Sequence, residues 1–534
     1  MQPSLPTQTP RPSQTKIVAT VGPACSSEEQ LAALITAGVD VFRLNMAHGT
    51  PKEQEVRLAA IRRASERLGQ PVALLVDLAG PKIRLGELPG GQLQCGPNDR
   101  VRFVRTAAAQ KEVANNVGSP SAGQSSAIAE LTATYAPLVD ELAVGDRIML
   151  ADGIVSLVVE RVTPDYAECR VIQPGLVRSR QGVNLPGVKL SVPAMSDVDR
   201  ANAVWAARQE IDFISLSFVR TAEDIRQLKA LLAAEKAAQA QGAGAAGAVP
   251  PPLPAAFEDR PQVIAKIEKP EALAQLGAIV AEADGVMVAR GDLGVEIDIA
   301  QVAVAQKEIV AECQRQRKPV IIATQMLDSM QHSRIPTRAE VADVANAILD
   351  GTDACMLSGE TAVGEYPREA VEMMHRVALA TEPMGRKDQG RGRASAARTV
   401  EGPGAFAQAT PAGLNTITES TVCAAGRLAE SLDAKLIVVA SASGATALSL
   451  AKHHFFVPTV GVSDSPATLR RMCLYWGMIP LPGAPVHDNA AVLRHVVEWG
   501  KAGGMLAAGD RVVLIAGTGL EHTAHNAIVV HQVS

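Results

Sequence analysis

The sequence alternates between short apolar runs and amphipathic helical patterns, and this alternation occurs eight times. Strand, helix and parallel strand form a right-handed βαβ unit, and eight strand–helix repeats predict an α/β fold of the (β/α)8 TIM barrel class. The predicted strands are residues 17–21, 39–44, 72–76, 213–216, 263–266, 285–288, 320–324 and 354–357. The predicted helices are residues 27–37, 51–68, 197–208, 221–238, 269–283, 300–317, 339–350 and 367–380.

Polar side chains recur where these runs end. In a barrel, the carboxyl ends of the strands carry the active groups. A doubly wound sheet would also alternate strands and helices, but it rarely places a polar group at every strand exit. The residues at these exits are Thr20, Arg43, Asn45, Asp77, Ser217, Lys266, Glu268, Asp292, Thr324 and Ser358.

The third strand–helix connection is far too long for a barrel loop. Its alternating strands and turns predict an inserted β-rich domain, placed as a lid over the barrel mouth. The Gly-, Ala- and Pro-rich composition of residues 237–256 predicts a loose surface extension of the fourth helix. The expected organisation is a disordered tail (1–15), a discontinuous catalytic barrel (16–85 and 190–384), the lid (86–189), a linker (385–412) and a C-terminal α/β effector or oligomerisation domain (413–534).

Composition excludes several classes of function. A net charge of −5 and only 3% aromatic residues argue against a nucleic-acid surface. No apolar run approaches the roughly 18 residues of a membrane span, and the first residues lack the apolar centre of a signal peptide. The seven cysteines are scattered without a CxxC pair, which predicts reduced thiols in a cytoplasmic protein.

The stretch from residue 263 to 296 places Lys266, Glu268 and Asp292 at the ends of neighbouring strands. One or two carboxylates that leave room for water and phosphate suit Mg²⁺ or Mn²⁺, so Glu268 and Asp292 are the predicted metal ligands. Each could instead serve only at a helix start. Lys266 ends an apolar strand, where an unpaired ammonium is costly, and we expect it to stabilise a transferring phosphoryl group.

Other strand-exit residues suit the same ligand. Arg43 and Arg84 could clamp phosphates bidentately, or could be ordinary surface arginines. The loop 289–294, which includes Gly291, offers backbone N–H groups for a carboxylate. Thr324 offers a hydroxyl to the same ligand.

Several long motifs resemble pyruvate kinase. They are KIVATVGPAC, VFRLNMAHG, VDLAGPKIR, GVNLPG, VIAKIEKPE, MVARGDLGVE, VIIATQMLDSM, PTRAEVADVANAILDG and CMLSGETAVGEYP, which occur in this order between about residues 16 and 384. The last domain is similar to the effector domain of that family. The resemblance implies phosphoryl transfer from phosphoenolpyruvate to ADP, giving pyruvate and ATP, in a homotetramer.

The resemblance also implies residue roles. Lys266 would stabilise the transferring phosphoryl group, and Glu268 and Asp292 would hold Mg²⁺. Gly291, Asp292 and Thr324 would receive the substrate carboxylate, while Arg43 would hold the phosphate. Arg84, Asn45 and His48 would face the nucleotide, although His48 could be a structural loop histidine.

The sequence departs from the family pattern near the expected K⁺ site. Members that need K⁺ carry Ser, Thr and Glu where this chain has Ala47, Leu78 and Lys82. A fixed ammonium can supply the positive charge of a bound ion, so we expect Lys82 to replace K⁺, with Asn45 and Asp77 keeping the pocket polar. Val198 also replaces a lysine often present in the family, which leaves one expected nucleotide contact in doubt.

A Ser/Gly/Thr loop precedes a helix in the last domain, with Ser441, Ser443, Gly444 and Thr446. Such a loop can hold a phosphate, and the family's sugar-phosphate effectors bind at the corresponding loop. An ordinary helix cap explains it equally well. Two rival functions remain for the whole chain: another Mg²⁺-dependent barrel enzyme such as a lyase or mutase, and a non-catalytic metabolite-binding paralogue.

Overall fold

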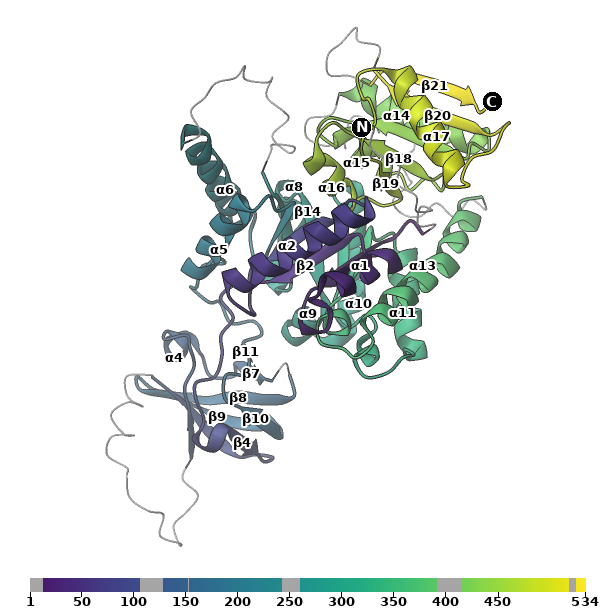
Figure 1. Cartoon of the computed structure of the whole chain (residues 1–534). Coiled ribbons are helices and arrows are strands. Elements are labelled where there is room, and N and C mark those ends of the chain that lie inside the picture. Colours follow the sequence, from purple (N-terminus) through teal and green to yellow (C-terminus); the bar gives the residue numbers. More distant parts are fainter. Residues whose placement is uncertain (1–12, 106–127, 152, 243–259, 391–414, 518–524) are drawn as a thin grey trace.

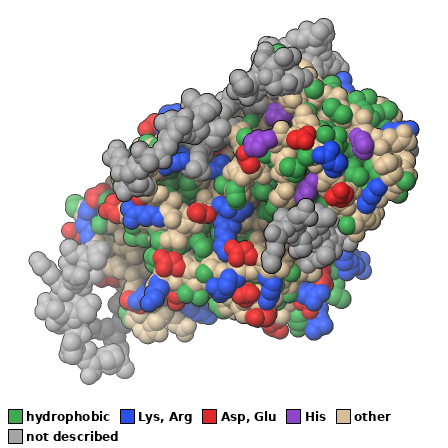
Figure 2. All heavy atoms as spheres, turned by 45° about the horizontal axis from the view of Figure 1, so that its top comes forward, with side chains coloured by type: hydrophobic (Ala, Val, Ile, Leu, Met, Phe, Trp, Pro, Cys, Tyr) green, Lys and Arg blue, Asp and Glu red, His purple; other side chains and the backbone are tan. Residues whose placement is uncertain are grey.

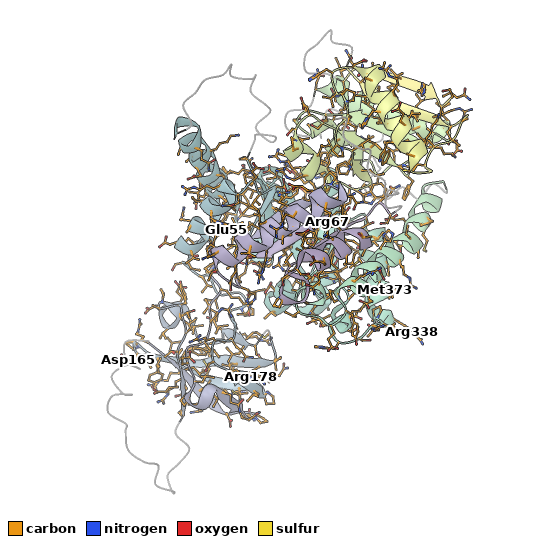
Figure 3. All side chains as sticks on the ribbon, viewed as in Figure 1. Glu55, Arg67, Asp165, Arg178, Arg338 and Met373 are labelled. Atoms are coloured by element: carbon orange, nitrogen blue, oxygen red, sulfur yellow. The ribbon has the colours of Figure 1, made fainter. Side chains whose placement is uncertain are left out.

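The computed structural model describes residues 13–105, 128–151, 153–242, 260–390, 415–517 and 525–534. Figure 1 shows a central barrel with the inserted β-rich region at one end and the C-terminal α/β region at the other. Figure 3 shows the same separation in side chains, with Asp165 and Arg178 on the inserted region and Glu55 and Arg67 on a barrel helix.

Eight parallel strands close the barrel in the order β1-β16-β15-β14-β13-β12-β3-β2. This closure confirms the (β/α)8 fold and excludes a doubly wound sheet. Apart from the half-buried Asn45 at the end of β2, all residues of these strands are buried, because helices cover the outside and side chains fill the inside. The strands are β1 (Lys16–Thr20), β2 (Val41–Asn45), β3 (Ala73–Asp77), β12 (Phe213–Leu216), β13 (Gln262–Ile267), β14 (Gly285–Ala289), β15 (Val320–Ala323) and β16 (Ala354–Leu357).

The outer helices begin at sequence-encoded caps. Ser27, Thr50, Ser196 and Thr337 each accept a hydrogen bond from the third helical residue, whose side chain accepts one in return. These capping boxes satisfy backbone N–H groups that a helix start leaves free. The main helices are α1 (Glu28–Ala37), α2 (Pro51–Leu68), α5 (Asp197–Arg208), α6 (Ala222–Gly242), α10 (Ile299–Arg315), α11 (Arg338–Leu349) and α13 (Pro367–Gly390).

Three local predictions were wrong. The helix expected over residues 269–283 is two helices, α7 (Pro270–Ala274) and α8 (Leu276–Glu282), because the backbone at Gln275 leaves the helical region (φ −117°, ψ 19°). The expected loop 289–294 lies mostly in a short helix, α9 (Arg290–Glu296). Helix α13 extends beyond residue 380 to Gly390, into the expected linker; residues 391–412 of that linker lie outside the described residues.

The inserted region, which we call the lid, has a six-stranded sheet in the order β11-β7-β8-β9-β5-β6 and a two-stranded sheet β10-β4. Phe103, Leu157 and Val171 are among the fully buried residues of its separate core. Its elements are β4 (Gln92–Cys95), β5 (Arg100–Val104), β6 (Ala129–Leu131), α4 (Leu138–Glu141), β7 (Arg147–Leu150), β8 (Val155–Val162), β9 (Tyr166–Gln173), β10 (Gly175–Arg178) and β11 (Val183–Asn184).

The C-terminal region forms a five-stranded sheet in the order β19-β18-β17-β20-β21. Its inner apolar residues, such as Val439 and Met472, belong to one hydrophobic cluster with barrel-interior residues such as Phe213 and Met287. Its elements are α14 (Thr416–Ser431), β17 (Leu436–Ala440), α15 (Ala445–Ala451), β18 (Thr459–Val462), α16 (Pro466–Met472), β19 (Met478–Pro480), α17 (Asn489–Ala502), β20 (Arg511–Ala516) and β21 (Ala527–Gln532).

Residues 13–15, which we expected in the tail, are part of the packed structure. The backbone N–H groups of Gln14 and Thr15 donate to Glu382 Oε1 at 3.0 and 2.8 Å, and the Gln14 carbonyl accepts from Gly477 N at 2.9 Å. These contacts tie the chain start to α13 and to the C-terminal region. Residues 1–12 of the expected tail, and residues 243–256 of the Ala/Gly/Pro-rich stretch, lie outside the described residues.

The surface carries mixed charge. Figure 2 shows Lys and Arg side chains interspersed with Asp and Glu on one face of the molecule. None of the helices in the described ranges is long and apolar enough to cross a membrane. All seven cysteines are buried and free.

Candidate active site

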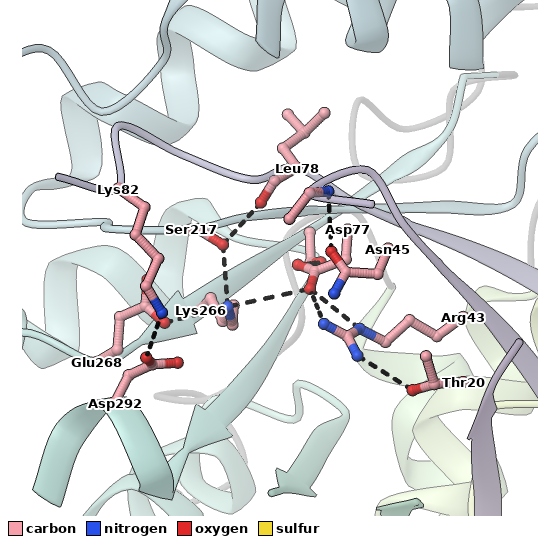
Figure 4. Close-up of polar contacts among 12 residues, drawn as sticks. Thr20, Arg43, Asn45, Asp77, Leu78, Lys82, Ser217, Lys266, Glu268 and Asp292 are labelled. Carbon is pink, nitrogen blue, oxygen red and sulfur yellow. Dashed lines mark hydrogen bonds and ion pairs between the residues drawn. The ribbon is translucent and has the colours of Figure 1, made fainter. Parts of the chain in front are cut away.

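Lys266, at the end of β13, is the centre of the polar cluster at the barrel mouth (Figure 4). Its Nζ lies 3.1 Å from Glu268 Oε2 and 4.0 Å from Asp77 Oδ2, and it donates to Ser217 Oγ at 3.0 Å. The lysine is 9% exposed and Glu268 only 1%. Parallel strands bring these residues together because their carboxyl ends share one rim of the barrel.

The cluster keeps its lysine charged. Burial alone would lower the pKa of Lys266, but the carboxylates of Asp77, Glu268 and Asp292 outweigh burial and raise that pKa above its ordinary value. For Glu268, burial is the largest influence and Asp292 adds to it, so its pKa is raised to about 7 despite the nearby Lys266 ammonium. Glu268 is therefore a buried acid whose ionised form lacks sufficient positive charge from the protein alone.

The donor set fits a hard divalent cation. Glu268 Oε1 accepts the Phe218 backbone N–H at 2.6 Å, whereas the buried Oε2 has no hydrogen-bond partner of good geometry among the described residues and lies 3.1 Å from Lys266 Nζ. The Asp292 side chain, 33% exposed, opens toward the mouth. The described residues contain no cluster of three or more His, Cys, Asp or Glu side chains that could hold a metal, so water and substrate oxygens would complete the coordination.

Arg43 and Asp77 form a second ion pair beside Lys266. The Arg43 Nε atom donates to Asp77 Oδ2 at 3.0 Å, Nη2 also contacts that oxygen, and Nη1 donates to Thr20 Oγ1 at 3.1 Å. Burial would raise the pKa of Asp77, but Lys266 and Arg43 lower it below its ordinary value. A charged Asp77 thus lies against both the Arg43 and the Lys266 cations.

Lys82 extends toward the proposed metal ligands. Its Nζ lies 3.9 Å from Asp292 Oδ1, and Figure 4 shows it on the side of Glu268 and Asp292. The other residues of the expected K⁺ pocket are engaged with the protein: Asn45 Oδ1 accepts from Ala47 N at 3.0 Å, and the Leu78 carbonyl accepts from Ser217 Oγ at 2.8 Å.

Thr324 and Gly291, both expected near a substrate carboxylate, are bonded to each other. Gly291 N donates to Thr324 Oγ1 at 2.7 Å. Thr324 has φ +67°, a strained conformation for a β-branched residue. Arg290 holds it there, because its Nη2 donates to the Thr324 and Gln325 carbonyls at 2.9 and 3.0 Å.

The expected nucleotide residues lie at two places around the mouth. Asn45 ends strand β2 and His48 lies in the loop that follows, and the carbonyls of both residues accept from the buried Gln54 Nε2, at 3.2 and 2.8 Å. Arg84 lies on the hinge, by which we mean the two segments, about residues 80–85 and 180–183, that connect the barrel to the lid. It forms a β-bridge with Gly182, and its side chain donates to the Arg180 carbonyl at 3.2 Å. Burial lowers the pKa of His48, and the charges of Arg84, Arg43 and Lys82 lower it further.

The expected effector loop is internally bonded. Ser441 Oγ accepts from Gly444 N at 3.1 Å, and Ser443 Oγ accepts from Ala445 N at 3.3 Å. Thr446 Oγ1 is 3.1 Å from His525 Nδ1. The N-cap of helix α15 is Gly444, which makes no side-chain cap hydrogen bond, so the serine hydroxyls stabilise the loop rather than form an ordinary helix cap.

Sequence reasoning assigned no role to several residues that shape the site. Ser215 Oγ donates to Asp77 Oδ1 at 2.5 Å, Gln54 supports the Asn45–His48 loop, and Arg290 positions Thr324. Ser215 gave a weak signal, since it is a polar residue inside an apolar strand. Gln54 and Arg290 act through contacts that no local pattern specifies.

Comparison with known proteins agrees with this architecture. The family model for the pyruvate kinase barrel domain matches residues 12–241 and 255–371, and the model for the pyruvate kinase alpha/beta domain matches residues 419–531. A pyruvate kinase of Geobacillus stearothermophilus is 38% identical over 98% of this chain and 80% of its own length. Pyruvate kinase 2 of a Synechocystis strain is also 38% identical, over 95% of this chain and 77% of its own.

A solved structure shows the same arrangement. The crystal structure of a pyruvate kinase from Cryptosporidium parvum superimposes with a TM-score of 0.82 at 29% identity, and the match covers 98% of this chain and 96% of that one. Fold, site and relatives define a phosphotransferase built on a (β/α)8 barrel. The chain belongs to the pyruvate kinase family.

Proposed function

We propose that the protein transfers the phosphoryl group of phosphoenolpyruvate to ADP, using Lys266, Arg43 and a divalent cation held by Glu268 and Asp292. The observation that carries this proposal is the buried Lys266 ammonium, kept charged by three carboxylates at the barrel mouth. When bound, Mg²⁺ or Mn²⁺ would supply positive charge to the phosphate and carboxylate oxygens of the substrate.

The chain's own residues then supply the rest of the site. Lys266 and Arg43 neutralise charge that spreads over the phosphoryl oxygens during transfer. Their fixed positions, set by Asp77, reduce the reorganisation that the reaction requires. Thr324, Gly291 and Asp292 border the place for the substrate carboxylate, and Asn45, His48 and Arg84 border the place for the nucleotide.

A coupled assay tests this function directly. Phosphoenolpyruvate and ADP are supplied with Mg²⁺, and pyruvate is detected through lactate dehydrogenase. Lys266→Met should lower kcat by at least about a hundredfold, because it removes a charge aimed at the transition state. Turnover of phosphoenolpyruvate without ADP would favour the lyase or mutase alternative, and no turnover by the unmodified protein would favour a non-catalytic role.

We also propose that the enzyme works without K⁺. The Lys82 ammonium lies beside Asp292, while the Leu78 carbonyl, the Asn45 amide oxygen and the Asp77 carboxylate already accept hydrogen bonds from the protein. A fixed positive charge beside the proposed metal ligands can replace the charge of a bound monovalent ion.

Activity in Tris or tetramethylammonium salts, with and without KCl, tests the proposal. We expect less than about a twofold change on adding K⁺, and a rise of about tenfold, worth roughly 1.4 kcal/mol, would refute it. Lys82→Glu is expected to make activity depend on K⁺, whereas Lys82→Arg should remain independent of it.

We propose three further properties: a cytoplasmic location, which the scattered cysteines predict, and a homotetramer and activation by a phosphorylated metabolite at Ser441, Ser443, Gly444 and Thr446, which the resemblance to the family implies. Light scattering of the purified protein measures the assembly. Kinetics with sugar phosphates or AMP test the effector, and hyperbolic curves that none of them alters would oppose it.

A further inference from the structure

Glu296 contacts both the lid and the residues next to the proposed metal ligands. Its Oε1 accepts from Lys269 Nζ at 2.7 Å and from Asn184 Nδ2 at 3.3 Å. All three residues are buried, at 7%, 8% and 8% exposure. Asn184 belongs to lid strand β11, whereas Lys269 and Glu296 belong to the barrel.

The barrel end of this contact adjoins both metal ligands in sequence. Lys269 immediately follows Glu268, and Glu296 lies one helical turn after Asp292 in α9. The Lys269 Nζ also lies 5.5 Å from the centre of the Phe218 ring, and the Phe218 backbone N–H binds Glu268. A shift of Glu296 or Lys269 therefore moves the supports of both carboxylates.

The lid end adjoins the hinge. Val183 N donates to the Ile83 carbonyl at 2.9 Å, so the outgoing and returning hinge segments run together beside Asn184. A cavity between these segments and the barrel is lined by residues that include Ile83, Asn184, Phe218 and Lys269. Asn184, which lines this cavity, donates the hydrogen bond that joins lid strand β11 to helix α9 of the barrel.

We propose that Glu296 is a positioning residue that couples the seat of the lid to the Glu268–Asp292 pair. This inference rests on the proposed metal site and deepens it. It assigns to Glu296 the coupling between the lid, which borders the place for the nucleotide, and the metal ligands Glu268 and Asp292. Removing its charge leaves the Lys269 ammonium buried without its partner, and removing Asn184 releases only the lid.

A double-mutant cycle tests the coupling. Asn184→Ala keeps the Lys269–Glu296 pair, so it should fold and should raise the KM for ADP about three- to tenfold, the range of one hydrogen bond, with kcat and the KM for phosphoenolpyruvate unchanged. Glu296→Ala should raise the KM for ADP similarly and weaken Mn²⁺ binding to the substrate-free protein, measured by electron paramagnetic resonance. The double variant should match Glu296→Ala.

A matched control is Glu168→Gln, which removes a buried carboxylate paired with Arg102 on the lid sheet. It should change neither the KM for ADP nor Mn²⁺ binding. Each of three results would overturn the inference. The first is a KM for ADP in the double variant that is raised by the product of the two single effects. The others are an unchanged KM for ADP in Asn184→Ala and unaltered Mn²⁺ binding in Glu296→Ala. If Glu296→Ala does not fold, Glu296→Gln, which removes the charge but keeps a hydrogen-bond acceptor, takes its place in the cycle. Failure of this inference can be distinguished from failure of the proposed function, because in the second case the unmodified protein would show no turnover.

Discussion

Lys452 of the C-terminal region and Asp353 of the barrel form an ion pair that is closed to solvent. Lys452 Nζ lies 2.5 Å from Asp353 Oδ2, and the two side chains are 0% and 1% exposed. The same carboxylate oxygen accepts the Val320 backbone N–H at 2.8 Å. Burial would raise the pKa of Asp353, but Lys452 and His454 lower it below its ordinary value. This pair connects the two regions electrostatically.

Removal of Lys452 should destabilise the protein strongly. Lys452→Met leaves Asp353 buried without the ammonium that contacts it, which is expected to cost about 3–5 kcal/mol. Urea unfolding measures the loss. Arg368→Met, which breaks the exposed pair with Glu372, is the control and should change stability little. Equal effects of the two variants would contradict the predicted importance of burial.

The hydroxyl of Thr324 should matter more than its shape. Thr324→Val keeps the β-branched side chain but loses the bond to Gly291, so we expect kcat to fall by about a hundredfold. Thr324→Ser keeps the hydroxyl and should retain most of the activity. Coupled kinetics distinguish the two, and similar kcat values for both variants would refute a role for the hydroxyl.

Gly80→Ala should disturb the hinge. The backbone there has φ +68°, and an added Cβ would lie 2.4 Å from Phe218 Cδ2. We expect a loss of about 1–3 kcal/mol from overpacking and a raised KM for ADP. Gly69→Ala is the matched control, since Gly69 also has a positive φ (+61°) but nothing within 4 Å; it should lose about 1 kcal/mol with unchanged kinetics.

His525 should make the C-terminal region sensitive to mild acid. Its Nε2 donates to the Ala440 carbonyl at 2.6 Å, so Nδ1 accepts from the Thr446 hydroxyl in the neutral ring. Burial lowers the pKa of His525. The folded state therefore binds its proton less readily than the unfolded state, and stability falls as pH drops through about 6.5, the pKa of an unfolded histidine. His525→Gln should flatten this dependence in thermal unfolding between pH 7.5 and 5.5.

Much of the barrel could be predicted because local patterns encode it. The strands at residues 213–216 and 354–357 and the helix 51–68 have the predicted bounds, since apolar runs and capping residues define them. The nearness of Lys266, Glu268 and Asp292, which influence one another electrostatically, also follows from the order of the strands. The sequence could not predict the left-handed backbone of Thr324 or the Lys452–Asp353 pair, whose members are 99 residues apart, because both depend on tertiary contacts.

The shared hydrophobic cluster of the barrel interior and the C-terminal region has a consequence for how the molecule melts. Those two parts should take up heat as one cooperative unit, because neither can expose its side of the cluster alone. The lid keeps its own core and should give a separate, smaller calorimetric peak.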